Sequence, residues 1–134
     1  MSTSCLYGFK KDGKVKLMYN HSDSYPSGFG KDVVLFIREN TLKELNEICD
    51  KTKLVNRKEL PNDKDIVEMI EKHIYYKEDG EILNWEDIFW SNDTFLHYYK
   101  KDFFAMPDFS AWLSGCQDYL YIINLDTNKF EVYK

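Results

Sequence analysis

The chain has 134 residues, with 18 Lys and Arg against 23 Asp and Glu, which gives a formal net charge of −5. Hydrophobic residues make up 43% and aromatic residues 16%, which excludes a wholly disordered chain. The acidic balance, with Arg38 and Arg57 the only arginines, argues against nucleic acid as the main partner, and no apolar run approaches the roughly 20 residues of a membrane-spanning helix.

A hairpin is predicted first, over residues 4–19. Apolar and aromatic residues occupy 5–9, the Asp12-Gly13 pair is a strong hairpin-turn signal, and 15–19 begins with alternating apolar and polar residues. Turn-forming residues then fill 20–30, which predicts an irregular loop.

Helices are predicted in the middle of the chain. Apolar residues recur at helical spacing from about Gly30 to Arg38, and Thr41 with Glu44 forms a capping box at the start of a helix over 41–51. Asn62 and the acidic residues after it begin another helix, and Asn84 caps a short one. The predicted buried face of the helix that begins at Asn62 consists of Ile66, Met69, Ile70, His73 and Ile74, which makes His73 a core histidine.

The end of the chain is predicted to be a second hairpin. Residues 93–104 have helical aromatic spacing, with Pro107 ending that element, and 119–125 and 130–133 are rich in β-forming residues around a turn. The pattern predicts a single α+β domain over 1–134, with an antiparallel sheet from the two terminal hairpins packed against about four helices.

Cysteine and histidine usage predicts no metal and no cofactor. Cys5, Cys49 and Cys116 are odd in number and widely spaced, which favours reduced, mostly buried thiols and a cytoplasmic location. His21 and Asp23, with His73 or His97, match no established metal spacing.

Both ends of the chain resemble one family. Residues 3–9 are similar to a T-R-x-L-Y-G opening, and 19–30, YNHSDSYPSGFG, to a Y-N-H-x-D-S-Y-P-x-G-x-G loop. Residues 121–126 and 130–133 resemble a terminal Y-I-I-N-L-D and L-E-V-Y pattern. These motifs are typical of a widespread family of small uncharacterised microbial, phage and viral proteins. The resemblance implies no established activity, and Ser4 stands where the family usually has Arg.

The 19–30 loop is the candidate site, because rigid loops on a scaffold often carry binding sites. Two interpretations stay open, a binding site and pure architecture. If the loop is a binding site, a ligand or partner would contact several loop residues and one nearby aromatic side chain. Three other loop residues would then maintain the conformation of the loop. The binding set is Tyr19, His21, Asp23, Ser24, Tyr25 and Trp85, and the structural set is Pro26, Gly28 and Gly30.

Aromatic residues also have two interpretations. Tyr19, Tyr119, Tyr121 and Tyr133 either pack across strands or form, together with Trp85 and Trp90, a patch that binds a partner.

We therefore expect a non-catalytic binding protein for a protein partner or a small molecule. The family's distribution suggests a phage or mobile-element accessory protein that inhibits a host factor. The alternative is a small hydrolase or transferase that uses Asp23, His21 and Tyr25.

Overall fold

The N-terminal hairpin forms where the Asp-Gly pair predicts it. The computed structural model describes residues 3–92, 95–113, 115 and 117–134, with the main chain alone at 95–97. In it, β1 (Cys5–Lys11) and β2 (Lys14–Asn20) pair antiparallel. Asp12 and Gly13 join them with φ of 53° and 73°, the left-handed pair that a type I′ turn requires.

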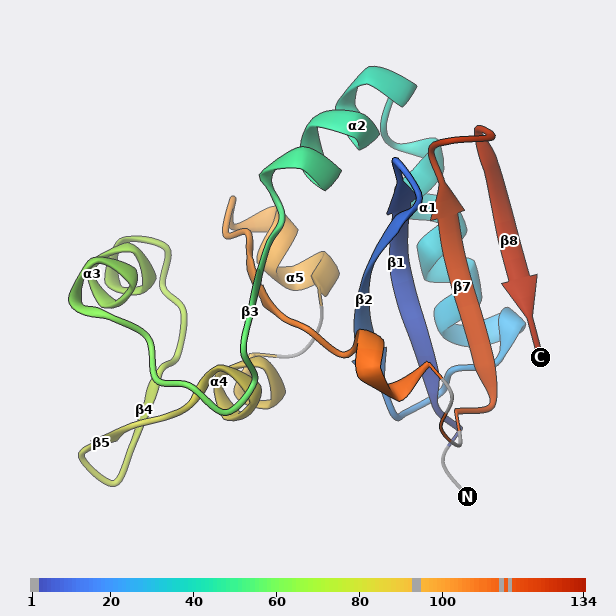
Figure 1. The fold of residues 1–134 in the computed structure, drawn as a ribbon. Coiled ribbons are helices and arrows are strands. Elements are labelled where there is room, and N and C mark those ends of the chain that lie inside the picture. The colour runs from blue at the N-terminus through green and yellow to red at the C-terminus, as the bar shows by residue number, and fades with distance from the viewer. Residues whose placement is uncertain (1–2, 93–94, 114, 116) are drawn as a thin grey trace. The chain divides into compact units, whose positions relative to one another are not determined.

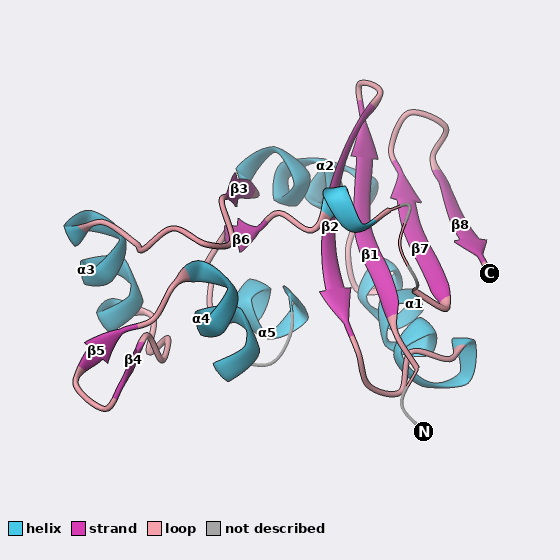
Figure 2. Cartoon of the chain, turned by 60° about the horizontal axis from the view of Figure 1, so that its bottom comes forward, coloured by secondary structure: helices cyan, strands magenta, loops and turns pink. Residues whose placement is uncertain are grey.

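The C-terminal hairpin is also confirmed, but the two hairpins join differently from the prediction. β7 (Tyr119–Asn124) and β8 (Lys129–Tyr133) are antiparallel, whereas β1 pairs parallel with β7. The sheet order is β2-β1-β7-β8 (Figure 2). The predicted wholly antiparallel sheet is therefore wrong at its centre: each hairpin turn fixes only its own pair of strands, and a long connection lets β7 run alongside β1.

The central strand β1 is buried on both faces. Because side chains alternate along a strand, Leu6 shares one face with its cross-strand neighbour Tyr19, and Tyr7 points to the opposite face. Tyr7 meets Phe29, whose ring centroid is 4.7 Å away. Phe29 belongs to η1 (Pro26–Gly30), a wide turn that leads into α1 (Lys31–Arg38) on that side of the sheet (Figure 1).

The helix α2 (Leu42–Lys51) begins at the predicted capping box. The Thr41 main-chain N–H donates to the Glu44 carboxylate at 2.8 Å, and the Glu44 N–H donates to the Thr41 hydroxyl at 3.1 Å. The other end of the helix is tied to the first hairpin, where the Lys11 ammonium lies 2.8 Å from the Asp50 carboxylate. The capping box fixes where the helix starts, and the ion pair holds its last turn against the hairpin.

The chain divides into two compact units, 1–51 with 109–134, and 52–108. The first unit contains the four-stranded sheet. Among the described residues, the second contains a parallel pair of short strands, a two-stranded hairpin and three helices. Its elements are β3 (Lys53–Val55), α3 (Asp63–Glu71), β4 (Lys77–Glu78), β5 (Glu81–Ile82), α4 (Trp85–Ser91), α5 (Phe95–Lys100) and β6 (Ala105–Pro107).

Two predictions for the second unit are corrected. The helix predicted over 93–104 is described only from Phe95 to Lys100, and Pro107 ends a strand that pairs with β3 rather than a helix. Residues 93 and 94 lie outside the described residues. His73 follows the end of α3 with φ 57° and is exposed, so it is not the predicted core histidine. Ile70 is also exposed, because α3 buries Met69 and little else.

The α+β class is confirmed, with four helices of seven to ten residues, α1 to α4, among the described residues. In the part of the chain that the structure describes, no helix has both the length and the apolar character needed to cross a membrane. The prediction that residues 1–134 form one domain stays a prediction, which a single cooperative unfolding transition would support.

Asp126 joins the turns of the two hairpins. Its carboxylate accepts the main-chain N–H groups of Asp12 at 2.7 Å and Gly13 at 3.0 Å. Those two hydrogen bonds, first from Gly13 and then from Asp12, lower the pKa of the Asp126 carboxyl.

We predict that Asp126 makes stability depend on pH in the acid range. Because its pKa is lower in the folded than in the unfolded state, its contribution is complete above about pH 5 and is lost as pH falls through the folded-state pKa. Asp126→Asn should therefore unfold more easily than the wild type at pH 7, by urea denaturation, with the difference shrinking below pH 4. Asp79→Asn, at an exposed turn of the second unit, is the control; an equal effect there would contradict the assignment.

Candidate functional site

The 19–30 loop is anchored through Ser24. Ser24 is fully buried, and its main-chain N–H donates to the Thr3 hydroxyl at 2.7 Å. The Asn20 side-chain amide donates to the Ser24 hydroxyl at 2.8 Å and to the Ser22 carbonyl at 2.7 Å. Ser24, predicted to contact a ligand, thus holds the loop to the start of β1.

The rest of the loop closes on itself. The Phe29 N–H donates to the Asp23 carbonyl at 2.8 Å, and the Gly28 N–H donates to the Tyr25 carbonyl at 2.9 Å. Asp23 has φ 51°, a left-handed conformation that Asp tolerates better than most residues. Pro26 is the first residue of η1. Its fixed φ suits this position, and the first turn of a helix does not need the N–H group that Pro lacks. These main-chain hydrogen bonds give the loop a defined turn conformation.

Tyr121 fixes the loop from the far end of the chain. Its hydroxyl donates to the Ser24 carbonyl at 2.7 Å. A Cβ at Gly30 would stand 3.0 Å from the Tyr121 ring, so this glycine lets the loop approach the ring. Burial, with the neighbouring Cys5 thiol, raises the pKa of Tyr121 to about 12, so the phenol stays a donor well above neutral pH.

We predict that Tyr121→Phe lowers the free energy of unfolding by about 1–2 kcal/mol, because it leaves the buried Ser24 carbonyl without this donor. Urea denaturation at pH 7 measures the change. Tyr75→Phe, at a side chain that is about half exposed, is the matched control and should change stability little. Equal effects of the two substitutions would show that the hydroxyl of Tyr121 does not anchor the loop.

The remaining predicted loop residues point in different directions. Tyr25 is 47% exposed, and its ring centroid lies 6.1 Å from that of Tyr119, on the α1 side of the sheet. His21 is exposed, with its ring 6.1 Å from that of Tyr19. Asp23 is exposed too, and its carboxylate lies against Gly28. The loop thus presents His21, Asp23 and Tyr25 to solvent, with the Tyr19 and Tyr25 rings each in contact with a neighbouring aromatic.

Trp85 is placed in the second unit, at the start of α4. It is 3% exposed and stacks on Phe103 at a centroid distance of 6.3 Å. Its indole is therefore core packing of that unit, and we assign it no surface for a partner.

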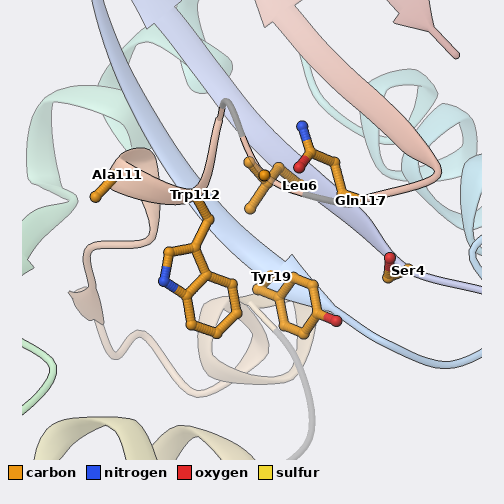
Figure 3. Close-up of a pocket in the computed structure, with 7 residues that line it drawn as sticks. Ser4, Leu6, Tyr19, Ala111, Trp112 and Gln117 are labelled. Atoms are coloured by element: carbon orange, nitrogen blue, oxygen red, sulfur yellow. The ribbon is translucent and has the colours of Figure 1, made fainter.

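A cavity of about 380 Å³ opens beside Tyr19, on the face of the sheet opposite α1 (Figure 3). The short helix η2 (Ser110–Trp112) brings Trp112 to this face, and the centroids of the Trp112 and Tyr19 rings are 4.9 Å apart at 72°. The Phe109 ring packs against both: its centroid lies 5.0 Å from that of Trp112 and 5.9 Å from that of Tyr19. The lining residues are Ser4, Leu6, Tyr19, Ala111, Trp112, Gly115 and Gln117.

The walls of the cavity combine aromatic and apolar side chains with a substantial share of polar surface. None of its seven described lining residues carries a charge at pH 7. The Ser4 main chain is fixed by Asp118, whose carboxylate accepts the Ser4 N–H at 2.9 Å, and the Ser4 hydroxyl accepts the Asp118 N–H at 3.3 Å. Small-molecule sites usually combine apolar walls with a few oriented polar groups, and this cavity has both kinds of surface.

Sequence reasoning found Tyr19 but missed Trp112 and Gln117. Tyr19 was singled out as part of the loop, and Ser4 as a departure from the family pattern. Trp112 lies more than 90 positions further along the chain, and its neighbourhood has no periodic pattern. The one sequence feature that points to this position is the Trp residue itself, which lies between two predicted elements.

No metal centre can be assigned to these residues. Among the residues that the structure describes, no group of three or more His, Cys, Asp and Glu side chains is placed to hold a metal ion. The His97 side chain and Cys116 lie outside the described residues. Cys5 and Cys49 are free and buried, and burial raises the pKa of the Cys5 thiol to about 12. A thiol in that state is a poor nucleophile at neutral pH.

Comparison with known proteins gives no further assignment: no protein-family model, curated protein or solved structure matches the chain. The family resemblance of the two terminal motifs and the loop therefore stays a prediction.

Proposed function

We propose that this is a non-catalytic binding protein that takes a small molecule in the cavity beside Tyr19. The observation that carries the proposal is the cavity of about 380 Å³, lined by the Tyr19 and Trp112 rings on a well-packed sheet. Two fixed aromatic rings offer a large contact area at little cost in conformational entropy. The site contains Tyr19, the first residue of the predicted 19–30 loop, and not the residues in the middle of that loop.

Binding is favoured over catalysis by the chemistry of the lining. A hydrolase or transferase needs a base or an activated nucleophile beside the substrate. The described lining holds only the Ser4 hydroxyl and the Tyr19 phenol as reactive oxygen groups, with no carboxylate or imidazole. The enzyme alternative with His21, Asp23 and Tyr25, and a host factor bound by a phage-type inhibitor, both stay predictions of the sequence.

Indole is a suitable probe, because it is small, flat and uncharged. A titration of ¹⁵N-labelled protein, followed by amide and indole N–H resonances, should shift the signal of Trp112 with a Kd of about 1 mM, as expected for a ligand of this size. Trp112→Leu should weaken binding at least tenfold while the spectrum stays dispersed. Trp90→Leu, at an exposed Trp of the second unit, is the matched control and should bind as the wild type does.

Two results would overturn the proposal. One is a Trp112 resonance that does not move up to 10 mM indole, roughly ten times the expected Kd. The other is an equal loss of affinity in the Trp112 and Trp90 variants. Asp23→Ala should leave indole affinity unchanged, since the Asp23 side chain does not line the cavity.

A further inference from the structure

Ser4 stands on the same face of the sheet as Leu6 and Tyr19. It directly precedes β1, and because side chains alternate along an extended chain, it shares a face with Leu6, the cross-strand neighbour of Tyr19. All three residues line the cavity. In Figure 3 the hydroxyl end of the Tyr19 ring points to the side on which Ser4 lies, away from Trp112. The cavity thus has an aromatic end at Trp112 and a hydroxyl end at Ser4.

The main chain of Ser4 is fully engaged by the segment that leads into β7. Its N–H donates to the Asp118 carboxylate at 2.9 Å. Its carbonyl accepts the N–H groups of Asp118 at 3.0 Å and Tyr119 at 3.1 Å. These bonds hold the residue in place, and its side chain is half-buried rather than covered. The hydroxyl is therefore the one polar group of Ser4 that is left for a ligand.

The proton of the Ser4 hydroxyl is available. The oxygen accepts the Asp118 N–H at 3.3 Å, whereas no acceptor among the described residues takes the proton. A ligand that displaces solvent from this hydroxyl and offers no acceptor loses affinity, because the donor is left unpaired. A ligand with an acceptor at this place gains a hydrogen bond instead.

Asp118 decides which kind of acceptor can bind. Its carboxylate places negative charge beside Ser4, and none of the seven described lining residues carries a positive charge. An anionic ligand would therefore lose its hydration and gain no cation in return. The rings of Tyr19 and Trp112 favour a flat ligand. We propose, resting on the function proposed above, that the ligand is an uncharged flat ring compound with a nitrogen or carbonyl acceptor at its edge for the Ser4 hydroxyl.

Two probes of nearly equal shape test this inference. Indole and indazole are both uncharged at pH 7, and both have a ring N–H. Indazole differs by a second ring nitrogen in place of a C–H group, which is an acceptor in the plane of the ring. The Kd of each is measured by the same NMR titration on the full chain, and we expect indazole to bind about fivefold more tightly.

Variants of Ser4 assign this preference to the hydroxyl. Ser4→Ala keeps the main-chain hydrogen bonds of residue 4, and the two Kd values should become equal because indazole binding weakens. Ser4→Thr keeps a hydroxyl and should keep the preference, whereas Ser4→Val, of the same shape as Thr, should lose it. This second pair decides the case if Ser4→Ala fails to fold. Ser27→Ala, at an exposed serine of η1, is the matched control.

The outcomes separate the two proposals. If neither probe binds, the cavity is not a binding site and the proposed function fails. If both bind with the same affinity in the wild type, the cavity binds flat ligands and the acceptor assignment is wrong. A preference for indazole that persists in Ser4→Ala or Ser4→Val, or that is lost equally in Ser27→Ala, also overturns the assignment, because it would not come from the Ser4 hydroxyl.

Discussion

Gly28→Ala is expected to lower the free energy of unfolding by about 3 kcal/mol. Gly28 has φ −104° and ψ −106°, outside the regions that residues with a Cβ adopt readily. A Cβ there would also lie 2.6 Å from the Asp23 carboxyl carbon and 2.7 Å from the Asp23 carbonyl oxygen. The loop must therefore open, and urea denaturation of the variant at pH 7 measures the cost.

A double-mutant cycle separates the two causes. Asp23→Gly removes the carboxylate and suits the positive φ at this position. In that background, Gly28→Ala should cost less than in the wild type but still destabilise, since the carbonyl oxygen of residue 23 remains. An identical cost in both backgrounds would show that the Asp23 side chain does not press on Gly28.

Gly8→Ala is expected to have a still larger effect, about 4 kcal/mol or complete loss of folding. Gly8 lies in the middle of β1, between Leu17 and Ile122, with φ +154°. A Cβ at this position would overlap the Lys16 carbonyl oxygen and lie 3.2 Å from the Leu17 Cα, and both belong to the main chain of β2. Main-chain atoms of a paired strand cannot move aside without breaking the ladder.

Gly13→Ala is the control for Gly8→Ala. Gly13 also has a positive φ, 73°, but a Cβ there would meet nothing within 4 Å. We expect a loss of only about 1 kcal/mol, the cost of a left-handed alanine. Differential scanning calorimetry on both variants compares them directly, and a smaller loss for Gly8→Ala than for Gly13→Ala would contradict the account of β1.

Local signals in the sequence predicted the elements that depend on local chemistry. The Asp12-Gly13 pair has the two left-handed residues of a type I′ turn, and Thr41 with Glu44 forms the expected reciprocal hydrogen bonds. Asn62 and Asn84 cap their helices as predicted. In each case the residues that form the contact lie within four positions of one another.

The contacts that the sequence could not predict join distant residues. Tyr121 and Ser24 are 97 positions apart, and no property of either residue indicates the bond between them. The parallel pairing of β1 with β7 has the same origin, because strand composition does not encode which strands become neighbours. For the same reason β3 and β6, each only three residues long, were not predicted.

The candidate site was predicted in part. The Pro and Gly pattern of the loop predicts a turn, and main-chain hydrogen bonds from Gly28 and Phe29 close that turn, while Tyr19 lines a cavity. Trp85 was chosen because Trp is frequent at interfaces, but its helix buries it. The partner of Tyr19 is instead Trp112, brought to the sheet by a three-residue helix that no periodicity announces.

The aromatic content thus divides between two roles. Tyr121 and Phe29 pack between the sheet and η1, with ring centroids 6.5 Å apart, and support the loop. Tyr19 and Trp112 line a cavity on the other face of the sheet. The same residue types therefore serve as core on one face and as candidate binding surface on the other.

The most direct test of this account is a measurement of nuclear Overhauser effects between indole and the isotope-labelled protein. We predict contacts from the indole ring protons to the side chains of Tyr19, Trp112 and Leu6. Contacts confined to the exposed loop residues His21 and Tyr25, or to the second unit, would contradict the assignment of the cavity as the binding site.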